Sequence, residues 1–184
     1  MEKITAAHGS GGKMTGELIK GIFEKHFKND VLSRMEDSAS LDISSSRIAF
    51  TTDSFVITPP FFKGGDIGKL AVCGTVNDLL TAGAVPKYIS AAFIIEQGFS
   101  TSELDIIAGS MAAAAKEAGV TIVTGDTKVV EGSGSNVYIN TAGIGELYGK
   151  SICAANVKAG DAVILSGTLG DHHACIMSER MGIE

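Results

Sequence analysis

The chain has 184 residues, a formal net charge of −6 and 23 glycines. Its length is enough to bury a core, and 45% hydrophobic with 20% charged residues exclude a disordered or fibrous protein. The acidic balance, the lack of Trp and an aromatic content of 6% argue against nucleic-acid binding. If the protein binds phosphates, a cation must mediate the contact.

The spacing of the cysteines and the distribution of apolar residues indicate the cellular compartment of the protein. Cys73, Cys153 and Cys175 stand far apart without a CxxC pair, which favours neither a disulfide framework nor a zinc site. The first residues lack the apolar stretch of a signal peptide, and no apolar run is long enough to cross a bilayer. We therefore expect a cytoplasmic protein that contacts no membrane.

The N-terminal third predicts an arm, a helix and two strands. His8-Gly9-Ser10-Gly11-Gly12-Lys13 is too glycine-rich for a helix or a strand, so we expect a flexible arm up to residue 13. Apolar residues then recur at helical spacing through residues 14–27, which predicts an amphipathic helix. Strand-like runs follow at 47–52 and 55–58 and end at Pro59-Pro60.

Capping signals define two helices in the middle of the chain. Asp66 is a suitable N-cap for a helix that runs to about residue 82. Ser100-x-x-Glu103 is a capping box, and the helix that it opens closes at Gly119. Strands are predicted at 88–96, 120–124 and 137–147.

The order of elements indicates the fold class. Helix, strands, helix, strand, helix and strands predict an α/β (α+β) fold, a sheet with helices packed on one side. A further strand at 162–166 and a helix from about Asp171 follow a connection rich in Gly and Lys. We therefore expect one domain over residues 1–148 and the beginning of a second, truncated domain over residues 149–184.

The arm invites comparison with a P-loop, because Gly9-Ser10-Gly11-Gly12-Lys13 is a glycine-rich run that ends in lysine. Ala7 occupies the place of the first required glycine, Met14 follows the lysine, and no strand precedes the run. The match therefore fails. The arm is either disordered or a lid that closes over phosphates, and both alternatives stay open.

Four aspartates stand at the ends of predicted elements: Asp37, Asp53, Asp78 and Asp126. An aspartate in such a place most often bonds its own backbone in a turn. Asp78 differs, because it lies on a helix beside apolar residues and we expect it close to buried surface, where it needs a cation or donors. Gly74 and Thr81 leave room for a ligand, and magnesium is the natural cation for carboxylates and phosphates.

Asp126 and Lys128 fall in a Gly-Asp-Thr-Lys turn that is predicted after the strand at 120–124. Ligands gather at strand ends in open sheets. A carboxylate for metal and a cation for phosphate are the parts that phosphoryl transfer requires. The alternative for Lys128 is an ordinary solvated lysine.

Together these segments resemble the N-terminal domain of the PurM-like family, which includes aminoimidazole ribonucleotide (AIR) synthetase, selenophosphate synthetase and thiamine-monophosphate kinase. The resemblance spans nearly the whole chain, and its motifs are Thr52-Asp53-Ser54 and residues 65–71, 75–79, 83–86 and 125–130. Within that family, residues 8–12 and 166–172 resemble the hydrogenase-maturation branch, HypE.

The resemblance implies a mixed sheet with helices on one face that pairs with its twin in a homodimer to form a barrel, with ATP near the interface. The matching positions hold Mg2+ on the ATP phosphates at Asp37, Asp53, Asp78 and Asp126. The same site is lined by Asn77, Thr127 and Lys128, with Lys128 as the catalytic residue. Gly11 and Gly12 belong to the mobile phosphate cover.

The activity implied is that of an ATP-dependent carbamoyl dehydratase, a lyase of [NiFe]-hydrogenase maturation. The carbamoyltransferase HypF delivers a carbamoyl group to a C-terminal cysteine, and ATP drives its dehydration to a thiocyanate. The cyano group then passes to the HypC and HypD scaffold as a cyanide ligand for iron. No counterpart of the acceptor tail occurs in residues 1–184, so we expect an ATP-binding fragment that does not form thiocyanate.

Two other readings remain open. The chain is alternatively another ATP-dependent enzyme of the family, such as a selenophosphate synthetase or a small-molecule kinase. An arm with His8 and Ser10 but no Cys counts against the synthetase. The chain is otherwise a non-catalytic module that binds nucleotide and dimerises.

Overall fold

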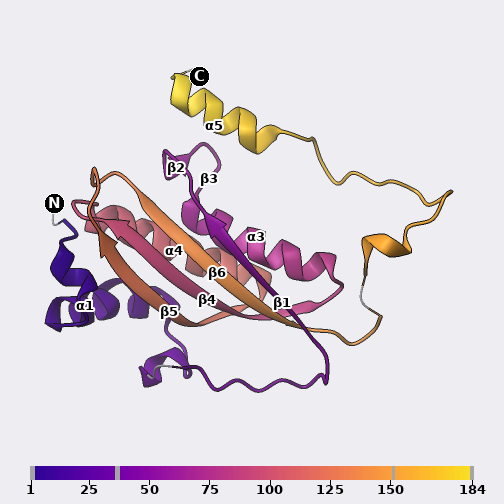
Figure 1. Cartoon of the computed structure of the whole chain (residues 1–184), viewed down its shortest axis with the longest axis horizontal. Helices are drawn as coiled ribbons and strands as arrows, with labels where there is room; N and C mark the ends of the chain where they lie inside the picture. Colours follow the sequence, from indigo (N-terminus) through magenta and orange to yellow (C-terminus); the bar gives the residue numbers. More distant parts are fainter. Residues whose placement is uncertain (1–2, 36–37, 151, 183–184) are drawn as a thin grey trace.

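A mixed four-stranded sheet forms the centre of the computed structural model, which describes residues 3–35, 38–150 and 152–182 (Figure 1). The strand order is β1 (Ile48–Phe55), β6 (Val137–Glu146), β4 (Val85–Glu96) and β5 (Thr121–Val130). Strand β6 runs antiparallel to β1 and to β4, whereas β4 and β5 are parallel. The last strand in the sequence therefore lies inside the sheet.

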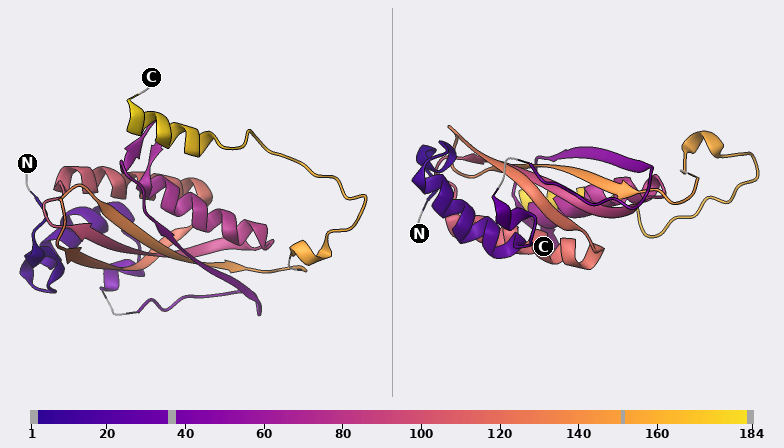
Figure 2. Two further views of the ribbon diagram at one scale, coloured as in Figure 1. Left: turned by 45° about the horizontal axis from the view of Figure 1, so that its top comes forward. Right: turned by 90° about the horizontal axis from the view of Figure 1, so that it is seen from below.

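Two long helices, α3 (Ile67–Thr81) and α4 (Thr101–Ala118), pack against each other and cover one face of the sheet (Figure 2). Asp66 caps α3, since its Oδ1 accepts from the backbone N–H groups of Gly68 at 2.7 Å and Lys69 at 3.0 Å. Gly119 ends α4 with a φ of +68°. The predicted fold class, with helices on one face, is confirmed.

The core lies between these helices and the sheet, and its fully buried side chains include Ile89, Ile95, Leu104, Ile107 and Met111. Strand residues alternate between the two faces, and none of the helices in the described part of the chain covers the opposite face. Large apolar side chains remain exposed there, and Phe50 is 65% exposed. The sheet is thus half covered within one chain.

The N-terminal segment forms short helices beside β5 (Figure 1). They are η1 (Ala6–Gly9), α1 (Lys13–Leu18), the π-helical η2 (Ile19–Glu24), α2 (Lys25–Phe27) and η3 (Leu32–Arg34). The helix predicted at 14–27 is confirmed. The prediction of an arm without helix is wrong at η1, which packs on β5 so closely that a Cβ on Gly9 would lie 2.5 Å from the Val129 nitrogen.

Two strand predictions are wrong in extent. The runs at 47–52 and 55–58 form one strand, β1, which begins at Ile48 and ends at Phe55. Strand β5 continues past residue 124 to Val130, so Asp126 and Lys128 lie within a strand and not in a turn. The missing side chain of Gly125 permits this, because a Cβ there would lie 2.2 Å from the Ala91 carbonyl oxygen on β4.

The C-terminal part contains η4 (Ala154–Asn156) and α5 (Asp171–Met181). The predicted helix is confirmed, but the strand predicted at 162–166 is wrong, because none of the described strands lies beside it and Val163 is 99% exposed. Figure 2 shows the chain running away from the sheet before α5 returns to the hairpin of β2 (Phe61–Phe62) and β3 (Gly65–Asp66). The domain boundary after residue 148 stays a prediction.

Hydrogen bonds and a ring contact between Phe62 and His172 fix α5 to the segment around the hairpin. The backbone N–H of Lys63 donates to Glu179 Oε1 at 3.0 Å, and Arg180 Nε donates to the Thr58 carbonyl at 2.7 Å. Over the ranges described above, no helix is both long and apolar enough to span a membrane.

Candidate functional site

A cavity of about 470 Å³ lies between the N-terminal helices and strand β5. Its apolar wall includes the aromatic rings of Phe23, Phe27 and Phe93, and the centroids of Phe23 and Phe93 are 4.6 Å apart. Its polar lining includes Gly11 from the arm, Thr15 from α1, and Asp126 and Lys128 from β5. The cavity therefore has an apolar side and a charged side.

Asp126 and Lys128 form an ion pair at this cavity, with Lys128 Nζ 3.0 Å from Asp126 Oδ1. The same carboxylate oxygen accepts from the backbone N–H of Thr127 at 2.8 Å. The Lys128 hydrogen bond, followed by that of Thr127, lowers the pKa of Asp126 from its ordinary value, so this carboxyl stays ionised. Both side chains of the pair are more than half exposed and accessible to a ligand.

A local hydrogen bond joins the arm to α1 at the edge of the cavity. The backbone N–H of Gly11 donates to Thr15 Oγ1 at 3.0 Å, and Gly11 has a φ of +81°, a conformation that favours glycine. Gly12 follows as the N-cap of α1. The structure thus brings Gly11, Thr127, Lys128 and Asp126, four of the residues that the resemblance assigns to the site, to one cavity.

A second group of predicted residues lies between β1 and α3. Thr51 Oγ1 donates to Asp78 Oδ2 at 3.0 Å, and Asp53 Oδ2 lies 3.6 Å from the position of a Cβ on Gly74. Gly74 and Asp78 are one helical turn apart, so both carboxylates face the junction of β1 and α3. Asn77 is exposed beside Asp78.

The expectation that Asp78 lies close to buried surface is wrong, because Asp78 is exposed. Strand β1 is an edge strand, and beyond it no described strand covers this side of α3. The expectation that Gly74 leaves room for a ligand is also wrong, because the ring of Phe55 fills that space: a Cβ on Gly74 would lie 2.8 Å from Phe55 Cζ.

The two groups lie far apart in a single chain. Strands β1 and β5 are the opposite edges of the sheet, with β6 and β4 between them, and three strand spacings amount to roughly 14 Å. Asp37, the fourth predicted ligand, lies outside the described residues. The single chain does not bring Asp126 to Asp53 and Asp78.

The side chains present suit a magnesium ion that keeps water and phosphate oxygens among its ligands. In the part of the chain that the structure describes, no three His, Cys, Asp or Glu side chains converge on a metal position. Magnesium commonly takes one or two carboxylates and completes its shell with water and phosphate oxygens. The carboxylates of the half-exposed Asp53 and the exposed Asp78 fit this form.

Sequence reasoning missed the apolar wall of the cavity. Phe23 and Phe27 belong to the amphipathic stripe of the N-terminal helix, and their spacing predicts core residues. Both side chains are in fact buried, yet they also line the cavity. Periodicity shows which helix face is apolar, and it does not show whether the packing opposite that face is complete.

Comparison with known proteins places the chain in a family. Residues 35–147 match the model of the family "AIR synthase related protein, N-terminal domain". The chain is 50% identical over 184 residues to the carbamoyl dehydratase HypE of Rhizobium leguminosarum bv. viciae, covering 99% of this chain and 53% of that protein. The chain spans about half the length of the curated relatives that it matches.

Solved structures agree. A crystal structure of the hydrogenase maturation protein HypE in complex with ATP has a TM-score of 0.94 and 45% identity, covering 98% of this chain and 54% of that one. A crystal structure of a HypE–HypF complex has a TM-score of 0.72 and 51% identity, covering 91% of this chain and 54% of that one. The chain therefore belongs to the AIR synthase related protein family, and within that family it is a relative of the HypE hydrogenase maturation proteins.

Proposed function

We propose that this chain forms the ATP-binding part of an ATP-dependent carbamoyl dehydratase, a lyase that acts in [NiFe]-hydrogenase maturation in the cytoplasm. The observation that carries the proposal is the cavity, where the glycine arm meets the ionised Asp126 and the ammonium group of Lys128. The names of the relatives and the ATP complex of a related HypE support it.

The two sides of the cavity suit the two ends of a nucleotide. The wall around Phe23 and Phe93 offers apolar surface to a flat base. The arm and Lys128 offer backbone N–H groups and a cation to phosphates. We assign to Lys128 the stabilisation of charge that develops on the transferred phosphoryl group.

Magnesium offsets the negative charge of the protein, which is −6 overall. We assign Asp37, Asp53, Asp78 and Asp126 as its ligands, with phosphate and water completing the shell. A homodimer resolves the distance between the two groups, because closing a barrel from two sheets joins free edges. Pairing of β1 with β5 of a second copy would bring Asp53 and Asp126 to one nucleotide.

The reaction proposed for the whole protein begins with a carbamoyl group that HypF transfers to a cysteine thiol. The thiocarboxamide oxygen attacks the γ-phosphorus of ATP, and ADP leaves. The nitrogen then loses its two protons, the C–O bond breaks with phosphate as the leaving group, and a thiocyanate results. The cyano group passes to the HypC and HypD scaffold. A related HypE has been solved in complex with HypF, which supports the first step.

Titration calorimetry of ATP with and without magnesium tests the nucleotide site. Asp53→Asn and Asp126→Asn should each weaken ATP binding in magnesium and leave the magnesium-free affinity nearly unchanged. Asp105→Asn is the matched control, because it removes one charge at the contact of α4 with Lys25 and His26 and lies outside the proposed site. Unchanged affinity in both site variants would refute the metal assignment, and a wild-type chain without ATP affinity would refute the site.

A further inference from the structure

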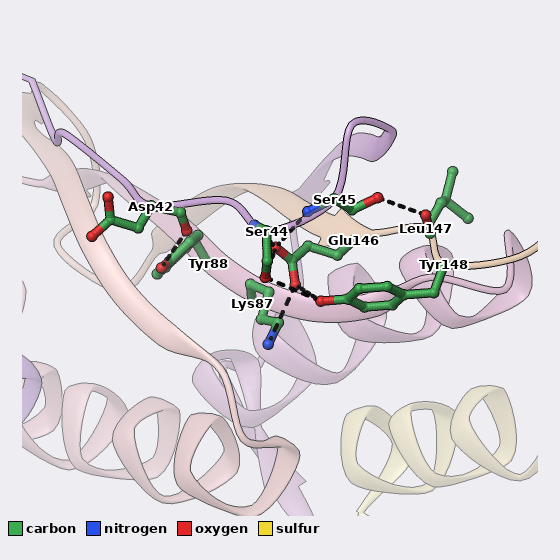
Figure 3. Close-up of polar contacts among 8 residues, drawn as sticks. All are labelled: Asp42, Ser44, Ser45, Lys87, Tyr88, Glu146, Leu147 and Tyr148. Atoms are coloured by element: carbon green, nitrogen blue, oxygen red, sulfur yellow. Dashed lines mark hydrogen bonds and ion pairs between the residues drawn. The ribbon is translucent and has the colours of Figure 1, made fainter.

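A buried carboxylate at the end of β6 holds a long segment of chain. The side chain of Glu146 is 3% exposed, although the alternation of β6 places it on the sheet face without helices. Its Oε1 accepts from the backbone N–H of Ser44 at 2.5 Å and from Ser44 Oγ at 2.9 Å. Figure 3 shows that the hydroxyl of Tyr148 and the ammonium group of Lys87 meet the same carboxylate.

The segment held in this way is residues 38–47, the rim segment. It contains no helix or strand, and most of its residues are exposed. Its first residue, Ser38, lines the cavity described above. Two more bonds hold it farther along, from Tyr88 Oη to the Asp42 carbonyl at 3.0 Å and from Ser45 Oγ to the Leu147 carbonyl at 2.7 Å (Figure 3).

We propose that Glu146 is a positioning residue, which fixes the rim segment from the far end of β6 and thereby sets the cavity wall at Ser38. The inference rests on the proposed function, since it assigns to Glu146 an effect on nucleotide binding. An exposed segment without regular structure opens at little cost, so its order depends on such tethers. Glu146 holds the segment close to the residue at which β1 begins.

The chemistry of the cluster suits this role. Hydrogen bonds from Tyr148 and Ser44 lower the pKa of Glu146 from 4.5 to about 2, so the group is an acceptor at every physiological pH. A carboxylate has enough lone pairs to accept from Ser44, Tyr148 and Lys87 together. The Lys87 ammonium, 3.4 Å from Oε2, balances the buried charge.

The chain contains a matched control in Glu96, the last residue of β4. Its carboxylate is also buried and accepts from Ser133 Oγ at 2.9 Å and from Asn136 Nδ2 at 2.9 Å. Its pKa is likewise lowered to about 2, mainly by Asn136 and Ser133. The loop that Glu96 holds, residues 131–136, does not line the cavity.

Hydrogen exchange of the rim segment and calorimetry of magnesium–ATP binding test the proposal in Glu146→Ala, Glu146→Gln, Glu146→Asp and Glu96→Ala. Glu146→Ala should speed exchange at Ser44 and Ser45 about tenfold and weaken ATP binding about fivefold or more. Glutamine keeps the reach and an acceptor oxygen, so Glu146→Gln should recover most of both losses. The shorter Glu146→Asp should not, and Glu96→Ala should leave the rim segment and ATP binding unchanged.

Each contrary result has a definite meaning. The proposal is overturned if Glu146→Ala leaves exchange in residues 38–47 unchanged, or opens them without weakening ATP binding. It is also overturned if Glu96→Ala weakens ATP binding equally, because the effect is then general destabilisation. If the wild-type chain does not bind ATP, the proposed function fails, while exchange still decides whether Glu146 holds the rim segment.

Discussion

The ammonium group of Lys128 lies 3.0 Å from Asp126 Oδ1, and this hydrogen bond is the largest cause of the lowered pKa of that carboxyl. Lys128→Ala should therefore raise the pKa of Asp126 toward its ordinary value. A carboxyl-detected NMR titration measures the change, with Lys116→Ala on α4 as the control. An unaltered titration of Asp126 in Lys128→Ala would show that the pair is not formed in solution.

Lys128 should matter more to the reaction than to binding, because charge develops on the phosphoryl group in the transition state. In a full-length relative that carries the acceptor cysteine, the matching Lys→Ala change should lower turnover well beyond its loss of ATP affinity. Single-turnover formation of thiocyanate, followed by mass spectrometry, gives this comparison. Normal turnover with weaker ATP binding would refute the role.

Thr51 should tune the magnesium site through its 3.0 Å hydrogen bond to Asp78. Thr51→Val keeps the branched shape and removes the donor, and a hydrogen bond to a charged group contributes roughly 1.5–3 kcal/mol. We expect Thr51→Val to reduce ATP affinity in magnesium, by less than Asp78→Asn does. Thr52→Val is the neighbouring control, since Thr52 Oγ1 bonds the Thr141 carbonyl instead. Equal effects of the two valine variants would contradict the assignment.

Gly125 should be essential to the sheet. A Cβ at this position would lie 2.2 Å from the Ala91 carbonyl oxygen, so Gly125→Ala must move β5 away from β4. Overpacking of this kind costs about 1–3 kcal/mol of unfolding free energy. Urea denaturation measures it, with Gly16→Ala as the control, because a Cβ on Gly16 in α1 meets nothing within 4 Å. Equal stability of Gly125→Ala and the wild type would show that the strands are not in close contact there.

Low pH should weaken the hydrogen bonds that the carboxylates of Glu96 and Glu146 accept. Glu96 and Glu146 have pKa values of about 2 in the folded protein against an ordinary value of 4.5. A group with a depressed folded-state pKa stabilises the fold fully above its ordinary pKa, and the stabilisation is lost as the pH falls from about 4.5 toward 2. Unfolding free energy should fall across this range, and the Glu96→Gln, Glu146→Gln double variant should show a weaker pH dependence. Parallel pH profiles would contradict the prediction.

The sequence predicted the helices better than the strands, for a physical reason. Asp66 and Ser100 cap their helices by local hydrogen bonds, so a few neighbouring residues are enough to predict where each helix begins. The extent of β5 depends on β4, since Gly125 packs on Ala91, 34 positions earlier in the chain. A local pattern carries no such information.

For the candidate site too, local sequence predicts the residue types but not how they are grouped in space. Residue types and motifs predicted Asp53, Asp78, Asp126 and Lys128 as site residues, but their grouping depends on strand order, which separates β1 from β5. Glu146 escaped notice because its Gly-Glu-Leu context resembles an exposed strand end. Its burial arises from Ser44 and Tyr148, and the former is 102 positions away along the chain.

Because β6 lies inside the sheet, the sheet cannot be completed before β6 has been synthesised. Strand β1 pairs only with β6 among the described strands, and β6 also pairs with β4, so the sheet stays in two parts until residues 137–146 have left the ribosome. Until then, the edge of β1 has no partner within the described chain, and the apolar face of α3 that covers both β1 and β6 is incompletely buried. Such unpaired edges favour association with other chains. A nascent chain that pauses before residue 137 would thus depend on holding chaperones far more than one that has passed residue 146.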